Sequence, residues 1–224
     1  MQVITNMCGI FYNNFSLSYH QSNKILSLLK NRGPDKSNYI KIKNQNFIFT
    51  WLSTMNFGGY PIQPIHTKDK KLFFNGNIFN FKDLLNQFNL NPRKVKSDTE
   101  LLFILLTKKS FKDVINLIQG QFSILFFYKN KIYLTRDCFG QKPLYYSNIN
   151  NNLIISSLIP CIRIAANIEL IDQNYLKTYL LSGNNIYRGL KDNYSTIFKN
   201  VKSVKPGEII TIEDNKIIHR DIKP

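Results

Sequence analysis

Cys8 directly follows an internal methionine, Met7, and precedes Gly9, Ile10 and Phe11. A cysteine that becomes the first residue of a chain carries its thiol and a free α-amine on the same residue. The amine can then accept the thiol proton and act as the base that a nucleophile requires. Translation from Met7 with removal of that methionine, or cleavage of residues 1–7 as a short leader, would expose Cys8. The alternative is a buried, unreactive cysteine at the start of a strand, the usual state of a free cysteine.

Short apolar runs predict the elements that must position this cysteine. Ser18 is a predicted N-cap for a helix over 19–30, and Ser97 and Glu100 form a capping box ahead of the apolar run 101–106. Further helices are predicted over 81–88 and 172–181, and 183–196 is predicted to be a polar loop. Strands are predicted at 8–15, 39–43, 47–52, 72–75, 121–128, 131–135, 143–147, 153–157, 208–212 and 216–220. Mostly hairpin connections favour an α+β layered fold over a parallel doubly wound sheet.

Composition limits the possible function classes. The 224 residues carry a net charge of +16, but the lysines are spread along the whole chain, so we do not expect specific nucleic-acid binding. No apolar run approaches the roughly 18 residues of a membrane span, and no signal peptide is recognisable. The three cysteines have no metal-ligand spacing, and so odd and sparse a set suits a reducing compartment, which predicts a cytoplasmic protein.

Several motifs occur together in a recognisable order: 7–11 (MCGIF), 32–35 (RGPD), 75–80 (NGNIFN), 97–100 (SDTE) and 136–146 (RDCFGQKPLYY). In this order and spacing they resemble the class II glutamine amidotransferase domain, most closely the glutaminase half of glutamine-hydrolysing asparagine synthetase. The resemblance extends from Met7 over nearly the whole chain. It implies an N-terminal-nucleophile fold, a four-layer α-β-β-α sandwich with two antiparallel sheets.

The same resemblance implies a chemistry and assigns residues to it. Cys8 would attack the side-chain amide of L-glutamine, release ammonia and form a thioester that water hydrolyses to glutamate. The Asn75 side chain and the Gly76 backbone N–H would stabilise the oxyanion, although Asn-Gly is also an ordinary tight turn. Asp98 would hold the substrate's α-ammonium, and it also suits the first turn of a helix. Arg32, Asp35, Arg136 and Asp137 are expected to be structural.

The sequence departs from the family pattern around the substrate. Trp51, ahead of Leu52 and Ser53, stands where the family usually has the arginine that grips the substrate carboxylate. Its indole offers one neutral donor, so losing the charged pair could cost roughly 2–4 kcal/mol of binding. Asn77 replaces a usual glutamate, and Leu158 replaces another, with no role assigned. These changes keep an alternative open, a catalytically weakened or inactive binding or scaffold module.

The expected organisation has three parts. Residues 1–7 form a leader or a misassigned start, 8–195 the amidotransferase domain, and 196–224 a closing hairpin that leads toward a missing synthetase domain. The chain contains no Ser-Gly-Gly-x-Asp-Ser phosphate loop, so ATP and Mg²⁺ are expected only in such an absent domain. We therefore expect no cofactor or metal in this chain, and a separate ATP-dependent synthetase subunit as a partner.

Overall fold

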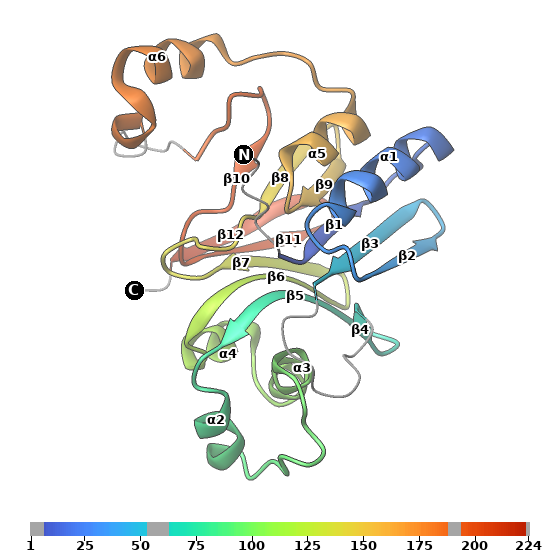
Figure 1. The fold of residues 1–224 in the computed structure, drawn as a ribbon, viewed down its shortest axis with the longest axis vertical. Coiled ribbons are helices and arrows are strands. Elements are labelled where there is room, and N and C mark those ends of the chain that lie inside the picture. The colour runs from blue at the N-terminus through green and yellow to red at the C-terminus, as the bar shows by residue number, and fades with distance from the viewer. Residues whose placement is uncertain (1–6, 53–62, 188–193, 223–224) are drawn as a thin grey trace.

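A computed structural model describes residues 7–52, 63–187 and 194–222 of the chain (Figure 1). Two six-stranded antiparallel sheets lie face to face, with helices on the outer face of each. The order of layers is helix, sheet, sheet, helix. The predicted α+β fold with two antiparallel sheets is thus confirmed.

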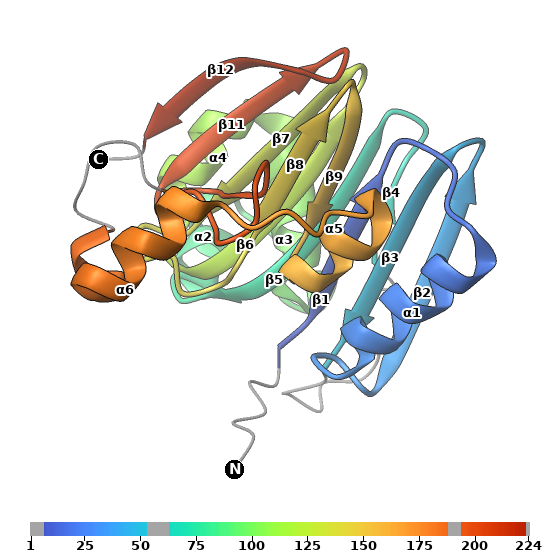
Figure 2. The same ribbon diagram turned by 90° about the horizontal axis from the view of Figure 1, so that it is seen from above.

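The first sheet has the strand order β10-β8-β9-β1-β3-β2, and the second has β12-β11-β7-β6-β5-β4 (Figure 2). The strands of the first sheet are β1 (Gly9–Asn13), β2 (Lys36–Ile42), β3 (Gln45–Trp51), β8 (Tyr145–Ile149), β9 (Asn152–Ser156) and β10 (Lys202–Ser203). Those of the second are β4 (Ile65–His66), β5 (Lys70–Ile78), β6 (Gly120–Tyr128), β7 (Lys131–Arg136), β11 (Glu208–Glu213) and β12 (Lys216–Ile222). Both sheets therefore include strands from the 196–224 segment, which is part of the same layered unit.

The helices divide between the two outer faces. Helices α1 (Tyr19–Lys30) and α5 (Ile159–Ala166) cover the first sheet, while α2 (Phe81–Gln87), α3 (Asp98–Lys108) and α4 (Phe111–Leu117) cover the second (Figure 1). The Ser18 and Ser97 capping boxes form as the sequence predicts. Helix α6 (Gln173–Tyr187) lies to one side of the layers and leaves Leu180 and Leu181 exposed.

Three apolar clusters hold the layers together. The central one lies between the sheets and contains Ile10, Phe49, Phe73 and Leu134, all buried. Each outer cluster lies between a sheet and its helices. Because strand side chains alternate between faces, Phe73, Asn75 and Asn77 of β5 share the face that looks toward the first sheet. That inner face is where the candidate chemistry is located.

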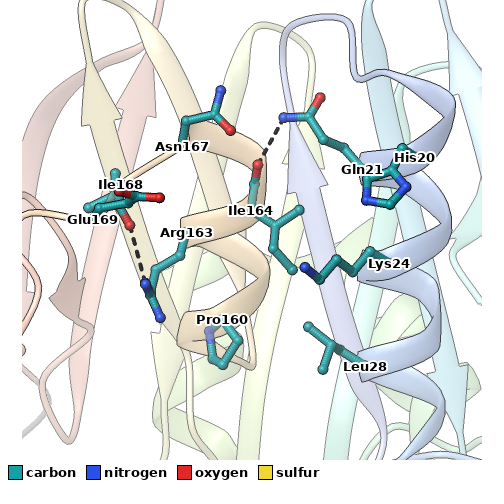
Figure 3. A pocket seen from close by; sticks show the side chains of 10 residues that line it. All are labelled: His20, Gln21, Lys24, Leu28, Pro160, Arg163, Ile164, Asn167, Ile168 and Glu169. Atoms are coloured by element: carbon teal, nitrogen blue, oxygen red, sulfur yellow. Dashed lines mark hydrogen bonds between the residues drawn. The ribbon is translucent and has the colours of Figure 1, made fainter.

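A groove of about 470 Å³ runs between α1 and α5 on the outside of the first sheet (Figure 3). Gln21 Nε2 donates to the Ile164 carbonyl at 2.9 Å, and Arg163 Nε donates to the Ile168 carbonyl at 3.2 Å. The Arg163 guanidinium also stacks on the Phe198 ring at 4.2 Å. These polar groups already have partners that join the two helices to each other and to the chain beyond α5. The groove is on the opposite face of the sheet from the central core.

The structure corrects one prediction and adds elements that were not predicted. Residues 183–187 continue α6, so the prediction of a loop from Gly183 is wrong at its start. A glycine inside a helix costs only about 1 kcal/mol relative to alanine, which does not by itself end a helix. The short helices α4 and α5 and the two-residue strands β4 and β10 were not predicted. The remainder of the predicted 183–196 loop lies partly outside the described residues.

Candidate active site

Cys8 lies directly before β1, at the end of a strand near the middle of the first sheet. Its carbonyl oxygen accepts from Arg32 Nε at 3.3 Å, and the Met7 N–H donates to the Arg32 carbonyl at 3.0 Å. The side chain packs against the central cluster between the sheets. Cys8 therefore points to the inner face. Arg32 holds the backbone on both sides of the Met7–Cys8 peptide bond. That bond would have to be absent for the Cys8 amine to act as a base.

The Cys8 thiol is in an environment of opposing influences. Burial raises its pKa, while the Leu52 backbone N–H and the charges of Lys142 and Arg32 lower it. Burial in turn lowers the pKa of the Arg32 guanidinium. The other cysteines differ: Cys138 is exposed, whereas Cys161 is fully buried in the outer cluster with its pKa raised to about 12 by desolvation. Of the three, only Cys8 combines partial exposure with nearby cations.

Asn75 and Gly76 lie inside β5, so the tight-turn alternative for this pair is excluded. Asn75 pairs with Ser123 and Gly76 with Phe122 across the β5–β6 ladder. A Cβ on Gly76 would lie 2.1 Å from the Gln121 carbonyl oxygen, so only glycine fits beside the neighbouring strand. Asn75 is 2% exposed, and its Nδ2 has no hydrogen-bond partner among the described residues. A buried donor without a partner is rare and calls for a functional explanation.

The edge of β5 shows how a second donor is left free. The Phe74 N–H donates away from β6 to Gln63 Oε1 at 2.7 Å, and the Ile78 N–H donates to Asp98 Oδ2 at 2.8 Å. Since backbone N–H groups two residues apart in a strand point to the same side, the Gly76 N–H points to this edge as well. No hydrogen bond from it to the described residues is found there. Two side chains thus satisfy the flanking donors and leave the middle one available.

Gln63 is the functional candidate that the sequence reasoning missed. Its side chain also donates to the Phe74 carbonyl at 3.0 Å, so it takes the place of a neighbouring strand at this edge. It precedes the short β4 by two residues and carries no motif of its own. Only the pairing of β4 with β5 brings it here, so the local sequence offers no signal for it.

Asp98 is the first residue of α3 and lies beside the same edge of β5. Burial raises the pKa of its carboxyl group, and the hydrogen bond from the Ile78 N–H opposes that rise. Asp98 therefore lies in the first turn of a helix, as one prediction for it requires. It also contacts the strand that carries Asn75 and Gly76, where a residue that binds the substrate would have to lie. Asn77, half-buried, is on the inner face of the same strand.

Trp51 is a core residue at the end of β3. It is 7% exposed, belongs to the central cluster and packs against Phe49 with ring centroids 5.7 Å apart. Thr50 pairs with Gly9, so Trp51 is at the level of Cys8 on the next strand. Leu52 follows, with its backbone N–H directed at the Cys8 thiol, while Ser53 lies outside the described residues. The structure thus brings Trp51 and Leu52 beside the nucleophile.

The loops after α1 and β7 are held by close packing and by hydrogen bonds, and the second confirms the structural roles predicted for Arg136 and Asp137. A Cβ on Gly33 would lie 2.5 Å from the Trp51 nitrogen, so the loop after α1 packs directly on β3. Asp137 is 1% exposed and accepts from the backbone N–H groups of Phe122, Phe139, Gln141 and Lys142. Arg136 donates to the carbonyls of Lys142 and Val204. Leu158 is the N-cap residue of α5 and provides no side-chain cap.

Solved structures share this fold. The structure described as the allosteric regulatory enzyme of purine biosynthesis superposes with a TM-score of 0.64 at 17% identity, over 96% of this chain and 49% of that one. Glutamine phosphoribosylpyrophosphate amidotransferase from Bacillus subtilis superposes with a TM-score of 0.63 at 16% identity, with the same coverage. These neighbours share the layered fold with two antiparallel sheets that is described above for this chain.

The sequence comparisons give the family. The glutamine amidotransferase domain model matches residues 7–222, and the chain belongs to this family. Asparagine synthetase [glutamine-hydrolyzing] 1 of Bacillus subtilis is 30% identical over 83% of this chain and 29% of its own length. The probable asparagine synthetase of Acanthamoeba polyphaga mimivirus is 29% identical over 66% of this chain and 29% of its own. The chain thus spans less than a third of these relatives, and the likeness favours an amidotransferase over the scaffold alternative.

Proposed function

We propose that this domain hydrolyses L-glutamine to glutamate and ammonia through a thioester on Cys8. The observation that carries the proposal is a pair of donors on β5, Asn75 Nδ2 and the Gly76 N–H, on the sheet that faces Cys8. Neither donor has a hydrogen-bond partner among the residues that the structure describes. Donors fixed in advance stabilise charge that develops on a carbonyl oxygen without having to reorganise. The family membership and the asparagine synthetase relatives support the same reaction.

The proposed steps use residues already placed. With Cys8 at the chain start, its α-amine takes the thiol proton and the sulfur attacks the side-chain carbonyl carbon of glutamine. Negative charge on the oxygen is held by Asn75 and Gly76, and ammonia leaves with the transferred proton. Water then attacks the thioester to give glutamate and restores the thiol. Asp98, with Asn77 beside it on β5, would hold the α-ammonium of the substrate.

We further propose that the ammonia is used by an ATP-dependent synthetase module, in asparagine synthesis or another amide transfer. The relatives are glutamine-hydrolysing asparagine synthetases, of which the matched region is 29%. ATP and Mg²⁺ would belong to that module, and glutamine hydrolysis itself would need no cofactor. No helix in the described part of the chain is long and apolar enough to cross a membrane, and we propose a cytoplasmic location.

The decisive experiment measures ammonia release from glutamine by protein that begins at Cys8, with Cys8→Ala as the matched control. We expect turnover by the first protein, none by the control, and a thioester on Cys8 in intact-mass spectra after rapid quenching. Protein that begins at Met1 should be inactive, because its Cys8 nitrogen is an amide. Binding of glutamine without ammonia release by protein that begins at Cys8 would favour the scaffold alternative.

A further inference from the structure

Lys142 is held beside the nucleophile although its motif was assigned no chemistry. Its backbone N–H donates to Asp137 Oδ2 at 3.2 Å, and its carbonyl accepts from Arg136 Nε at 2.6 Å. A buried carboxylate and a guanidinium therefore fix the same residue from both sides. The segment 137–144 passes from β7 of the second sheet to β8 of the first. The clamp thus fixes Lys142 where the chain crosses between the sheets.

The register of the first sheet places this crossing at the level of Cys8. Tyr145 of β8 pairs with Ser156 of β9, which pairs with Phe11 of β1. Cys8 lies three residues before Phe11, and Lys142 lies three residues before Tyr145. Strands β8 and β1 are both antiparallel to β9, so they run in the same direction, and the two residues lie at the same end of the sheet. The charge of Lys142 lowers the pKa of the Cys8 thiol, and Cys8 in turn raises the pKa of Lys142, whose pKa burial lowers.

The groups around Cys8 leave positive charge uncompensated. The Lys142 ammonium has no hydrogen bond or ion pair with the described residues. Asp137, the acid that raises its pKa, already accepts four backbone N–H groups. Arg32 is 7% exposed, and its Nη2 has no partner within the same residues. Tyr145 and Cys161 are the other titratable groups facing Arg32, and both are neutral when protonated. The charges of Lys142 and Arg32 both lower the pKa of the Cys8 thiol, against the larger effect of burial, which raises it.

We propose that Lys142 is a positioning residue that acts through Cys8: its backbone is held in place, and its ammonium favours the thiolate form of the nucleophile. Arg32 is the second cation, but it also holds the backbone at Cys8. Lys142 is therefore the cation that can be replaced without removing a hydrogen bond to that backbone. This role deepens the proposed glutaminase function and rests on it. The Arg136 and Asp137 clamp gains a purpose from it, since the clamp fixes the backbone of the residue that carries the charge.

The test measures the rate at which iodoacetamide alkylates Cys8 in the full-length chain as a function of pH, with each cysteine resolved by peptide mass spectrometry. Alkylation follows the thiolate fraction, partly offset by the lower nucleophilicity of a more acidic thiol. We expect Lys142→Met to shift the pH–rate curve toward higher pH and to slow alkylation near pH 7 by about three- to tenfold. Lys142→Arg keeps the charge and should restore the wild-type curve.

Lys36→Met is the matched control. Lys36 pairs with Trp51, two strands from β1 on the other side and at the same level, but it is exposed and does not affect the pKa of Cys8. It should leave the curve unchanged. The proposal is overturned if Lys142→Met leaves the curve in place, if Lys142→Arg behaves like the methionine variant, or if Lys36→Met shifts it equally.

Folding and function are separated by further measurements. Circular dichroism checks each variant, and Lys142→Gln replaces a methionine variant that does not fold. If neither variant folds, the pH–rate curve of the wild-type protein is measured at increasing salt concentrations. Salt screens the charge of a half-exposed lysine and should shift the curve toward higher pH. A curve that does not shift contradicts the proposal. Ammonia release is assayed separately on protein beginning at Cys8. A shifted alkylation curve with no ammonia release would reject the glutaminase function and leave the electrostatic role intact.

Discussion

The two halves of the candidate site are built in different ways. The cleavage half consists of Cys8, Asn75 and Gly76, which are fixed by strand ends, sheet register and a glycine that admits no side chain. The recognition half consists of Trp51, Asn77 and Asp98, whose contribution depends on the side chains themselves. Two departures from the family pattern, Trp51 and Asn77, fall in the recognition half, and the third, Leu158, belongs to neither half. The residue types that the family resemblance implies are thus kept in the cleavage half, and two of the changes fall on residues proposed to bind the substrate.

The sharpest test of this contrast removes the sulfur. Cys8→Ala in protein that begins at residue 8 should abolish ammonia release while leaving glutamine binding nearly unchanged, because the recognition half is intact. Isothermal titration calorimetry and an ammonia assay on the same preparation measure both. Loss of binding together with activity would show that the halves are not separable.

The next largest effect is expected at the oxyanion donor. Asn75→Ala should lower kcat by about 100- to 1000-fold with little change in KM, since a donor aimed at developing charge acts mainly in the transition state. Steady-state kinetics provides the measurement. Asn77→Ala, two residues along the same face, is the matched control and should change KM instead. Equal kcat effects at both positions would contradict the division.

Asp98→Asn should raise KM for glutamine by about 30-fold or more, because it removes the charge that would hold the substrate ammonium. The wild-type enzyme should also lose affinity on acidification. Burial raises the Asp98 pKa above its ordinary 3.8, so the carboxylate becomes protonated at a higher pH than an exposed aspartate. KM measured against pH should therefore begin to rise earlier on the acid side than for an ordinary carboxylate, and the rise should vanish in Asp98→Asn.

The smallest effect is expected where the recognition half has diverged. Trp51→Arg should lower KM by about three- to thirtyfold if it restores a carboxylate anchor, and should lower the melting temperature, because a cation enters a site that is 7% exposed. Trp51→Phe keeps the packing and should leave KM near the wild-type value. An arginine variant that folds but has an unchanged KM would locate the carboxylate anchor elsewhere.

Much of the fold could be read from local signals. Ser18 and Ser97 cap helices through contacts three residues away, so the sequence predicts those starts directly. Helix α4 has a comparable signal, since Ser110 accepts from the Asp113 N–H, and it was overlooked because its apolar run is short. Helix α5 has a proline in its first turn but no side-chain cap. Local chemistry thus predicted elements well where a cap was followed by a long apolar run.

The site was predicted less completely, for a physical reason. Cys8 was predicted from its place after Met7, and Asn75 and Asp98 through the family motifs. The structure places Asn75 in β5, Asp98 beside that strand at the start of α3, and Cys8 on the facing sheet. The Gly76 N–H at the edge of β5 depends on where Gln63 lies and on which residues of β5 point their N–H groups to that edge. Both follow from the pairing of strands far apart in the sequence. The burial of Trp51 likewise depends on how the sheets stack. No nearby residue in the sequence carries that information.

The Asn75 amide nitrogen, which has no hydrogen-bond partner within the described part of the chain, has a thermodynamic consequence for the whole domain. Leaving a buried polar group unsatisfied costs a folded protein about 1–3 kcal/mol. Selection for heat resistance alone would replace such a group with an aliphatic one, so the resting domain is less robust than its core allows. The deficit is repaid only while an oxygen of a reacting molecule occupies that position, and a slowly hydrolysed acyl adduct should therefore melt later than the unligated domain.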